Sequence, residues 1–225
     1  MVSSLNEYVN YLFIVTTMLT LWFFYKASES KLAVFVLLAW VALQGIISDS
    51  GFYTITDRVP PRFVFLVIPA LALVAYMMLS KKGLRFVDSL DTRWLTYLHV
   101  IRIPVEITLY LLFINRLVPE LMTFEGTNFD IFSGITAPLI AYFGYTSKKL
   151  SRGILLGWNF LCLALLANIV ITALLCAPFP FQQLAFEQPN VGVLYFPFSW
   201  LPGFVVPIVL FAHLVSIRQL LKIKL

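Results

Sequence analysis

Four side chains that can carry charge, protons or hydrogen bonds recur along one apolar stretch, residues 94–116. They are His99, Arg102, Glu106 and Tyr110. At about 100° per residue in an α-helix, this spacing places all four within roughly 60° of one another, on one face. The remaining positions are almost all Leu, Ile, Val and Phe. An ionisable group at the centre of a bilayer costs from about 3 to more than 10 kcal/mol, so this face must lie against protein or enclosed water.

The composition indicates an integral membrane protein. Of the 225 residues, 60% are hydrophobic and 12% are charged, and the mean hydropathy is +0.90, whereas about a quarter of the residues of a soluble domain carry charge. The length suits about seven spans of roughly 20 residues with short connections. Because the apolar runs are continuous and do not alternate with polar residues, we expect helices and not a β-barrel.

Charges, prolines and glycines divide the chain into seven predicted spans. We therefore expect an all-α, seven-helix membrane bundle that forms one domain over residues 1–225. The predicted spans are 8–25, 32–53, 62–80, 94–115, 129–147, 153–176 and 198–221. The start of the chain lacks the cationic region and cleavage site of a signal peptide, so we expect the first span to remain in the mature protein.

The basic residues predict how the bundle is oriented. Connections retained in the cytoplasm are rich in Lys and Arg. On one side of the predicted bundle lie Lys26, Lys31, Lys81, Lys82, Arg85, Arg93, Lys148, Lys149, Arg152, Arg218, Lys222 and Lys224, and on the other lie Arg58, Arg62 and Arg116. The N-terminus is therefore predicted outside and the C-terminus in the cytoplasm, as in a bacterial inner membrane protein. The basic pI of about 9.2 then indicates contact with anionic lipid headgroups and not with nucleic acid.

The two histidines of the chain, His99 and His213, are predicted at similar depth on the fourth and seventh spans, with Asn159 of the sixth span at about the same level. Paired imidazoles across a bundle can bind haem b axially or contribute to a metal site. Two nitrogens do not complete a zinc site, however. Two separately hydrogen-bonded packing residues are the simpler interpretation, so we expect no metal or cofactor.

Arg102 and Glu106 are four residues apart, so an ion pair within one helix is the simplest way to make both tolerable in a bilayer. Pro104 lies between them and has no N–H to offer the carbonyl of Val100, so we expect the helix to kink at this point. Carbonyls freed in this way suit a cavity that holds water or a ligand.

Prolines also mark the last span, which contains Pro197, Pro202 and Pro207. The carbonyls near Phe198 and Gly203 should therefore lose their helical partners, an arrangement found where protein or a cavity can satisfy the backbone. The alternative is that these prolines only shape packing, since proline is common in membrane helices.

The outer end of the predicted bundle collects a second set of polar residues. Gln44, Asp49, Arg62 and Asp130 are candidates for an outer vestibule. Asn128 or Asp130 alternatively caps the fifth span, where the helix dipole favours a carboxylate. The outer connection 177–197 is long, apolar and aromatic, so we expect it to fold over the bundle as a lid or to form an interfacial aromatic belt.

These patterns predict that the protein binds or moves a small anionic or amphipathic molecule, or a proton, through a polar cavity among the fourth, sixth and seventh spans. Arg102 would hold an anionic group, and Glu106 would neutralise it or carry a proton. An intramembrane enzyme or haem-linked redox protein that uses His99 and His213 is one alternative, and a structural subunit without a ligand is another. No phosphate loop, dinucleotide fingerprint or HExxH motif occurs, and the sequence does not indicate an oligomeric state.

Overall fold

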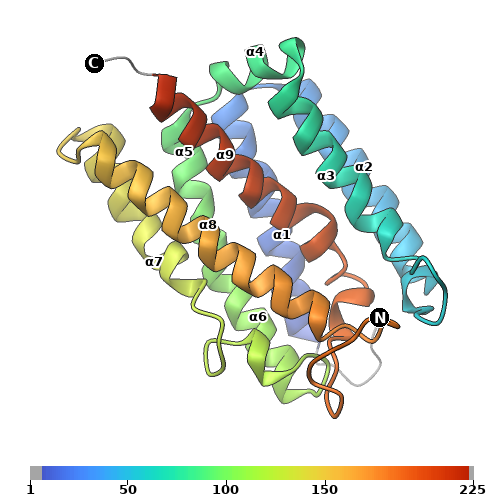
Figure 1. Cartoon of the computed structure of the whole chain (residues 1–225). Helices are drawn as coiled ribbons and strands as arrows, with labels where there is room; N and C mark the ends of the chain where they lie inside the picture. The colour runs from blue at the N-terminus through green and yellow to red at the C-terminus, as the bar shows by residue number, and fades with distance from the viewer. Residues whose placement is uncertain (1–6, 223–225) are drawn as a thin grey trace.

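A computed structural model describes residues 7–222, which are helical throughout their regular secondary structure (Figure 1). Lys224, one of the residues expected on the cytoplasmic side, lies outside this range. The α-helices of the described part are α1 (Glu7–Ser28), α2 (Lys31–Asp49), α3 (Val64–Leu79), α4 (Lys81–Ser89), α5 (Thr92–Leu98), α6 (Arg102–Ile114), α7 (Ile131–Ile140), α8 (Arg152–Leu175) and α9 (Val206–Lys222).

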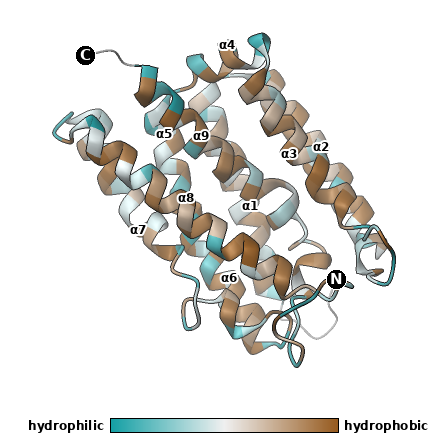
Figure 2. Ribbon diagram, in the orientation of Figure 1, coloured by the Kyte–Doolittle hydropathy of each residue, from teal (hydrophilic) through white to brown (hydrophobic). Residues whose placement is uncertain are grey.

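Several helices are long and apolar enough to cross a membrane, as expected for a multi-pass protein. Five segments of the described chain meet this condition: Glu7–Ser28, Lys31–Asp49, Thr92–Ile114, Arg152–Leu175 and Leu201–Lys222. In Figure 2 these helices are mostly hydrophobic, and polar residues concentrate at their ends and in the connections.

The two remaining predicted spans are shorter. The segment predicted as 62–80 forms α3, which has 16 residues and bends by 86° into α4. The segment predicted as 129–147 forms α7, which continues as a π-helix over Ala141–Thr146. Sixteen helical residues extend about 24 Å, less than the roughly 30 Å of a bilayer's hydrocarbon core. The described residues thus contain five candidate spans, or six if α3 and α4 together count as one broken span.

Serine and aspartate side chains start the helices at one end of the bundle. Ser30 caps α2, Ser80 caps α4, Asp91 caps α5 and Ser151 caps α8, each by accepting a hydrogen bond from a backbone N–H of the first turn. Ser80 thereby ends α3 and begins α4 at the sharp bend. A β-carbon at Gly83 would lie 2.4 Å from the carbonyl oxygen of Met77, so only glycine lets α4 fold back this closely on α3.

Helix α9 occupies the middle of the molecule. It packs against α5, α8 and α3, and α1 packs against α5 and α6. In Figure 1, α8 lies on one side of α9 and the α2–α3 pair on the other, with α4 beside the C-terminal end of α9. On α4, Asp88 accepts hydrogen bonds from Arg218 and Lys222 of α9. These two cations hold the pKa of Asp88 below its ordinary value and fasten α4 to α9.

Two tryptophans join α2 to the segment that precedes α9, which is π-helical over Leu201–Val205. Pro207 has no N–H to offer the carbonyl of Gly203, and the indole of Trp40 donates to that carbonyl at 2.9 Å instead. In the reverse direction, the indole of Trp200 donates to the carbonyl of Val41 at 2.9 Å. The backbone group freed by the proline is thus satisfied by a neighbouring helix, as expected for irregular backbone at membrane depth.

Replacing Trp40 by Phe should test this arrangement. The substitution keeps an aromatic ring but removes the donor to the carbonyl of Gly203, and a buried acceptor without a partner costs about 1–3 kcal/mol. We expect thermal unfolding of the purified protein in detergent to begin at a lower temperature. Trp22→Phe is the matched control, because it makes the same change at a tryptophan that is 45% exposed. Equal melting of the two variants would contradict the assigned role of Trp40.

Candidate functional site

The polar face of α6 forms hydrogen bonds to α8, to α9 and to Asp130 at the start of α7. Arg102 is 2% exposed, and its Nη1 donates to Oδ1 of Asp130 at 2.5 Å. Its Nη2 donates to Nε2 of His213 on α9 at 3.0 Å, and Nη1 also lies 3.4 Å from the carbonyl oxygen of Cys162 on α8. The buried guanidinium therefore links α6 to α7, α8 and α9.

The predicted ion pair between Arg102 and Glu106 is not the one that forms. Arg102 pairs with the carboxylate of Asp130, which is 28 residues away in the sequence. Helical spacing permits the local pair, but α7 brings a second carboxylate directly against the guanidinium. Gly134 of α7 allows this approach, since a β-carbon there would lie 2.8 Å from Cγ1 of Ile103.

Glu106 has a neutral partner in place of a cation. Both of its carboxylate oxygens accept from Nδ2 of Asn128, at 2.7 and 2.8 Å, and Oδ1 of Asn128 accepts from the backbone N–H of Asp130 at 3.1 Å. Asp130 stands at the N-cap position of α7 as expected, but its side chain makes no capping hydrogen bond. The Asp130 carboxylate binds the Arg102 guanidinium and not the backbone N–H groups of α7. A hydrogen bond between two charged groups is stronger than one to a neutral N–H group.

The hydrogen bonds of His213 define its tautomer. A guanidinium only donates, so Nε2 of His213 accepts from Arg102. Nδ1 lies 2.9 Å from Oδ1 of Asn159, whose Nδ2 donates to the carbonyl of Leu155. His213 is therefore a neutral imidazole with its proton on Nδ1, and Asn159 on α8 holds it in this state.

His99 stacks on His213, with 4.0 Å between the ring centroids and 18° between the ring planes. The two histidines that the sequence places at similar levels of the fourth and seventh spans are therefore in direct contact. His99 lies in a 3₁₀ turn, His99–Ile101, between α5 and α6. The helix is therefore irregular just before Pro104, where the sequence predicts a kink. Both ring nitrogens of His99 are buried without a hydrogen-bond partner in the described chain.

This stack does not fit a haem or a metal ion. Axial ligation requires two imidazole nitrogens that point at one metal from opposite sides, whereas these rings lie face to face. Both nitrogens of His213 are already occupied by Arg102 and Asn159. Within residues 7–222, no three His, Cys, Asp or Glu side chains form a group suited to a metal.

A cavity of about 360 Å³ lies beside this network, bounded by α3, α6, α8 and α9. We call it the chamber. Two carboxylates, those of Glu106 and Asp130, lie on its wall, and Asn190 contributes a further polar side chain. The rest of the wall is aliphatic and aromatic, and includes Val67, Leu109, Leu166, Val170, Val206 and Leu210. A cavity thus lies among the fourth, sixth and seventh predicted spans, but its wall is mainly apolar, and of the predicted ligand-binding residues only Glu106 lines it.

The 177–197 connection folds over the end of the bundle and contributes to the chamber. Nε2 of Gln188 donates to the carbonyls of Phe113 and Val118 at 3.0 and 2.6 Å. Nδ2 of Asn190 donates to the carbonyl of Ala173 at 3.1 Å, and its Oδ1 is buried without a partner in the described chain. The connection also packs on Tyr53 and Phe63, at the entry to α3.

The other predicted site residues lie apart from the network. Tyr110 stacks on Phe124 at 5.0 Å between ring centroids. Of the predicted vestibule, Gln44 accepts a hydrogen bond from the hydroxyl of Tyr53, Arg62 lies over the ring of Phe52 and Asp49 is exposed. Only Asp130 joins Arg102.

Sequence reasoning missed the role of Asn128 as partner of Glu106 and that of Asp130 as partner of Arg102. The available signal was a pair of polar residues at the outer start of the fifth predicted span. Both residues also fit an N-cap role, so the sequence pattern alone does not distinguish a helix cap from a partner of α6.

No family model, no curated protein and no solved structure matches this chain.

Double-mutant cycles should separate the two possible partners of Arg102. Removing one member of a buried ion pair costs about 3–5 kcal/mol, so Arg102→Met and Asp130→Asn should each lower the free energy of unfolding strongly. The double variant should lose much less free energy of unfolding than the sum of the two single losses, because it leaves no unpaired charge. Arg102→Met and Glu106→Gln should show a smaller coupling energy, because the guanidinium is paired with Asp130 and not with Glu106. Reversible unfolding in mixed micelles measures both cycles, and stronger coupling to Glu106 than to Asp130 would contradict the structure.

Proposed function

We propose that this chain is a multi-pass membrane protein that binds a small amphipathic molecule in the chamber, with an amine or another cationic end against Glu106. The observation that carries the proposal is the carboxylate of Glu106. It lies on the wall of an apolar cavity and accepts hydrogen bonds from a neutral amide only. A buried charge at membrane depth needs a partner of opposite sign.

The charges around the chamber support a cationic ligand. Glu106 and Asp130 contribute two carboxylates, Arg102 contributes one cation, and His213 is neutral by its hydrogen bonds. Arg102 is committed to Asp130, so Glu106 has no basic side chain within ion-pair distance in the described chain. A proton or a cationic ligand balances the charge that remains.

The same geometry disfavours the anionic ligand that the sequence led us to expect. Both terminal nitrogens of Arg102 are directed at protein acceptors, and Arg102 is not among the residues that line the chamber. An anion in the chamber would meet the carboxylates of Glu106 and Asp130. The apolar remainder of the wall suits a hydrocarbon or aromatic tail, as in many small-molecule sites.

The position of the chamber supports binding more than passage across the membrane. Its lining comes from the N-terminal half of α3 and the C-terminal half of α8, together with the 177–197 connection. The contact of His99 with His213 and Trp158 lies at the inner side of Arg102. We therefore propose a binding site in the outer half of the bundle.

We further propose that α3 and α7 also cross the membrane, which gives seven spans in a cell membrane with the N-terminus outside and the C-terminus in the cytoplasm. The basic residues support this topology, since most of them lie at the end of the bundle that holds α4 and the α7–α8 connection. A short span is accommodated by local thinning of the bilayer or by flanking residues.

Cysteine labelling in intact cells tests this topology. Cysteines placed at Glu125 and Lys148, two exposed residues on either side of α7, should differ in reactivity toward a membrane-impermeant maleimide. We expect labelling at position 125 only, because seven spans place position 148 inside. The native Cys162 and Cys176 are fully buried and should react little, so the unmodified protein is the background. Equal labelling at both positions would show that α7 does not cross.

Ligands that differ only in their polar end test the chamber. Decylamine, decanol and decanoate have the same tail, and we expect decylamine to raise the melting temperature most and decanoate least. Glu106→Gln keeps the size of the side chain but removes its charge, so it should abolish the preference for the amine. Glu125→Gln, at an exposed carboxylate, is the matched control and should leave the preference intact. A preference for decanoate that disappears in Arg102→Met would overturn the proposal in favour of an anion site.

A further inference from the structure

We infer that the protein also holds one anionic phospholipid, with an acyl chain in a groove between α2 and α3 and the phosphate beside Lys82 of α4. The groove lies on a different side of α9 from the chamber, and Pro207 borders both the chamber and the inner end of the groove. Ile208 and Phe211 of α9 line the groove, whereas Val206 and Leu210 line the chamber. The inference therefore does not depend on the ligand proposed for the chamber.

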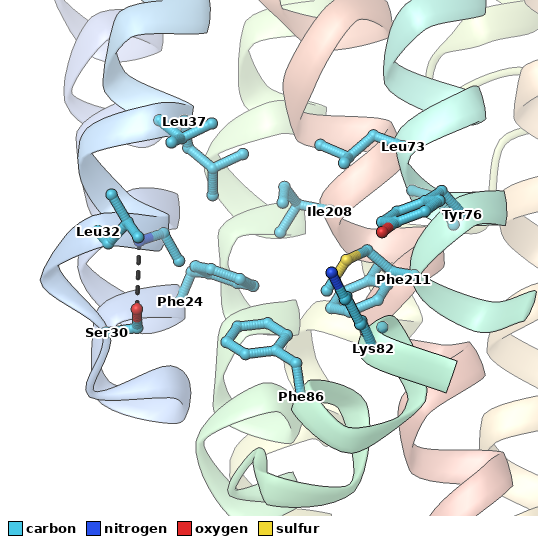
Figure 3. Close-up of a pocket in the computed structure, with 15 residues that line it drawn as sticks. Phe24, Ser30, Leu32, Leu37, Leu73, Tyr76, Lys82, Phe86, Ile208 and Phe211 are labelled. Carbon is cyan, nitrogen blue, oxygen red and sulfur yellow. Dashed lines mark hydrogen bonds between the residues drawn. The ribbon is translucent and has the colours of Figure 1, made fainter. Parts of the chain in front are cut away.

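The groove begins as a cavity of about 410 Å³ between the start of α2, the end of α3 and α4 (Figure 3). Its wall is formed by Phe24, Leu37, Leu73, Phe86, Ile208 and Phe211, among other apolar side chains. A second cavity of about 130 Å³ shares Leu37, Leu73 and Ile208 with the first and continues to Trp40 and Gly203. The two cavities follow one another along α2 and α3 and share part of their apolar walls, an arrangement that suits a hydrocarbon chain.

The groove is open to the surroundings of the bundle. Leu32 and Tyr76, on its two rims, are 72% and 54% exposed. For a protein in a bilayer, these exposed apolar positions face lipid. An occupant that enters from the side therefore comes from the membrane, and a lipid acyl chain is the molecule that the membrane supplies.

The charges at the α4 end select an anionic headgroup. Lys82 is exposed on α4 and lines the cavity, and Figure 3 shows its side chain beside those of Phe86 and Phe211. Lys81 and Arg85, also exposed, lie on the same short helix. No acidic residue lines the groove, and Asp88 of α4 is engaged by Arg218 and Lys222. The basic rim is therefore available to a phosphate, and basic residues near a membrane surface attract anionic lipid.

The amphipathic α4 sets the depth of this contact. The sharp bend after α3 turns α4 away from the direction of α3, so its basic residues lie where the apolar groove ends. A lysine of this kind keeps its methylene groups on apolar surface and its ammonium in the headgroup region. The acyl chain then extends from Lys82 toward Trp40.

Thermal melting of the delipidated full chain in a neutral detergent tests the inference. Dioleoylphosphatidylglycerol should raise the melting temperature by about 3 °C more than dioleoylphosphatidylcholine, which has the same acyl chains, because a bound ligand stabilises the native state. Inorganic phosphate alone should have no effect. Equal effects of the two lipids, or a full effect of phosphate alone, would overturn the inference.

Two variants connect the effect to the groove. Lys82→Gln should remove the advantage of the anionic lipid, whereas Lys148→Gln, an exposed lysine on the α7–α8 connection, should not. Ala33→Phe fills the groove and should abolish stabilisation by both lipids while leaving stabilisation by decylamine unchanged. If Ala33→Phe does not fold, native mass spectrometry provides the second test. We then expect a phospholipid to remain bound to the unmodified protein and to be lost from Lys82→Gln. Equal loss in Lys148→Gln would mean that surface charge alone attracts the lipid.

Discussion

The buried ion pair between Arg102 and Asp130 is the interaction on which the rest of the site depends. Neither charge is tolerable alone at membrane depth, so the start of α7 must lie against α6, and Gly134 permits that contact. The guanidinium also fixes the tautomer of His213, which in turn is held by Asn159. Because Asp130 takes the cation, Glu106 is left with Asn128. The pairing of Arg102 with Asp130 therefore explains why the chamber wall carries a carboxylate, that of Glu106, without a cation beside it.

The sequence contained enough to find the polar face but not its partners. His99, Arg102 and Glu106 stand out because charge is expensive in an apolar helix, and their common face follows from helical periodicity alone. The partner of Arg102 does not follow, since a local i, i+4 pair and a pair 28 residues away are equally compatible with composition. The depth of His99 and His213 was predictable from span order, but their stacking depends on the rotation of α9, which no local pattern determines.

The fold was predictable where helices are long and uninterrupted. Five predicted spans correspond to helices of sufficient length, whereas α3 and α7 are shorter. Ser80 caps a new helix directly after α3, and α7 continues as a π-helix over Ala141–Thr146. Proline showed that the carbonyl of Gly203 would lose its helical partner. It could not show that the replacement is the indole of Trp40, 163 residues away in the chain. Local chemistry thus predicts which backbone group needs a partner, and tertiary packing decides which residue supplies it.

Covalent labelling of Glu106 tests the central claim, that a buried carboxylate without a cation lies on the wall of an apolar chamber. A hydrophobic carbodiimide partitions into such a chamber and forms a stable adduct with a carboxyl group, which peptide mass spectrometry locates. We predict that Glu106 is the principal labelled residue, that Asp130 is protected by Arg102, and that decylamine slows the labelling of Glu106. Labelling of Asp130 in preference to Glu106, or labelling of Glu106 that decylamine does not slow, would contradict the account.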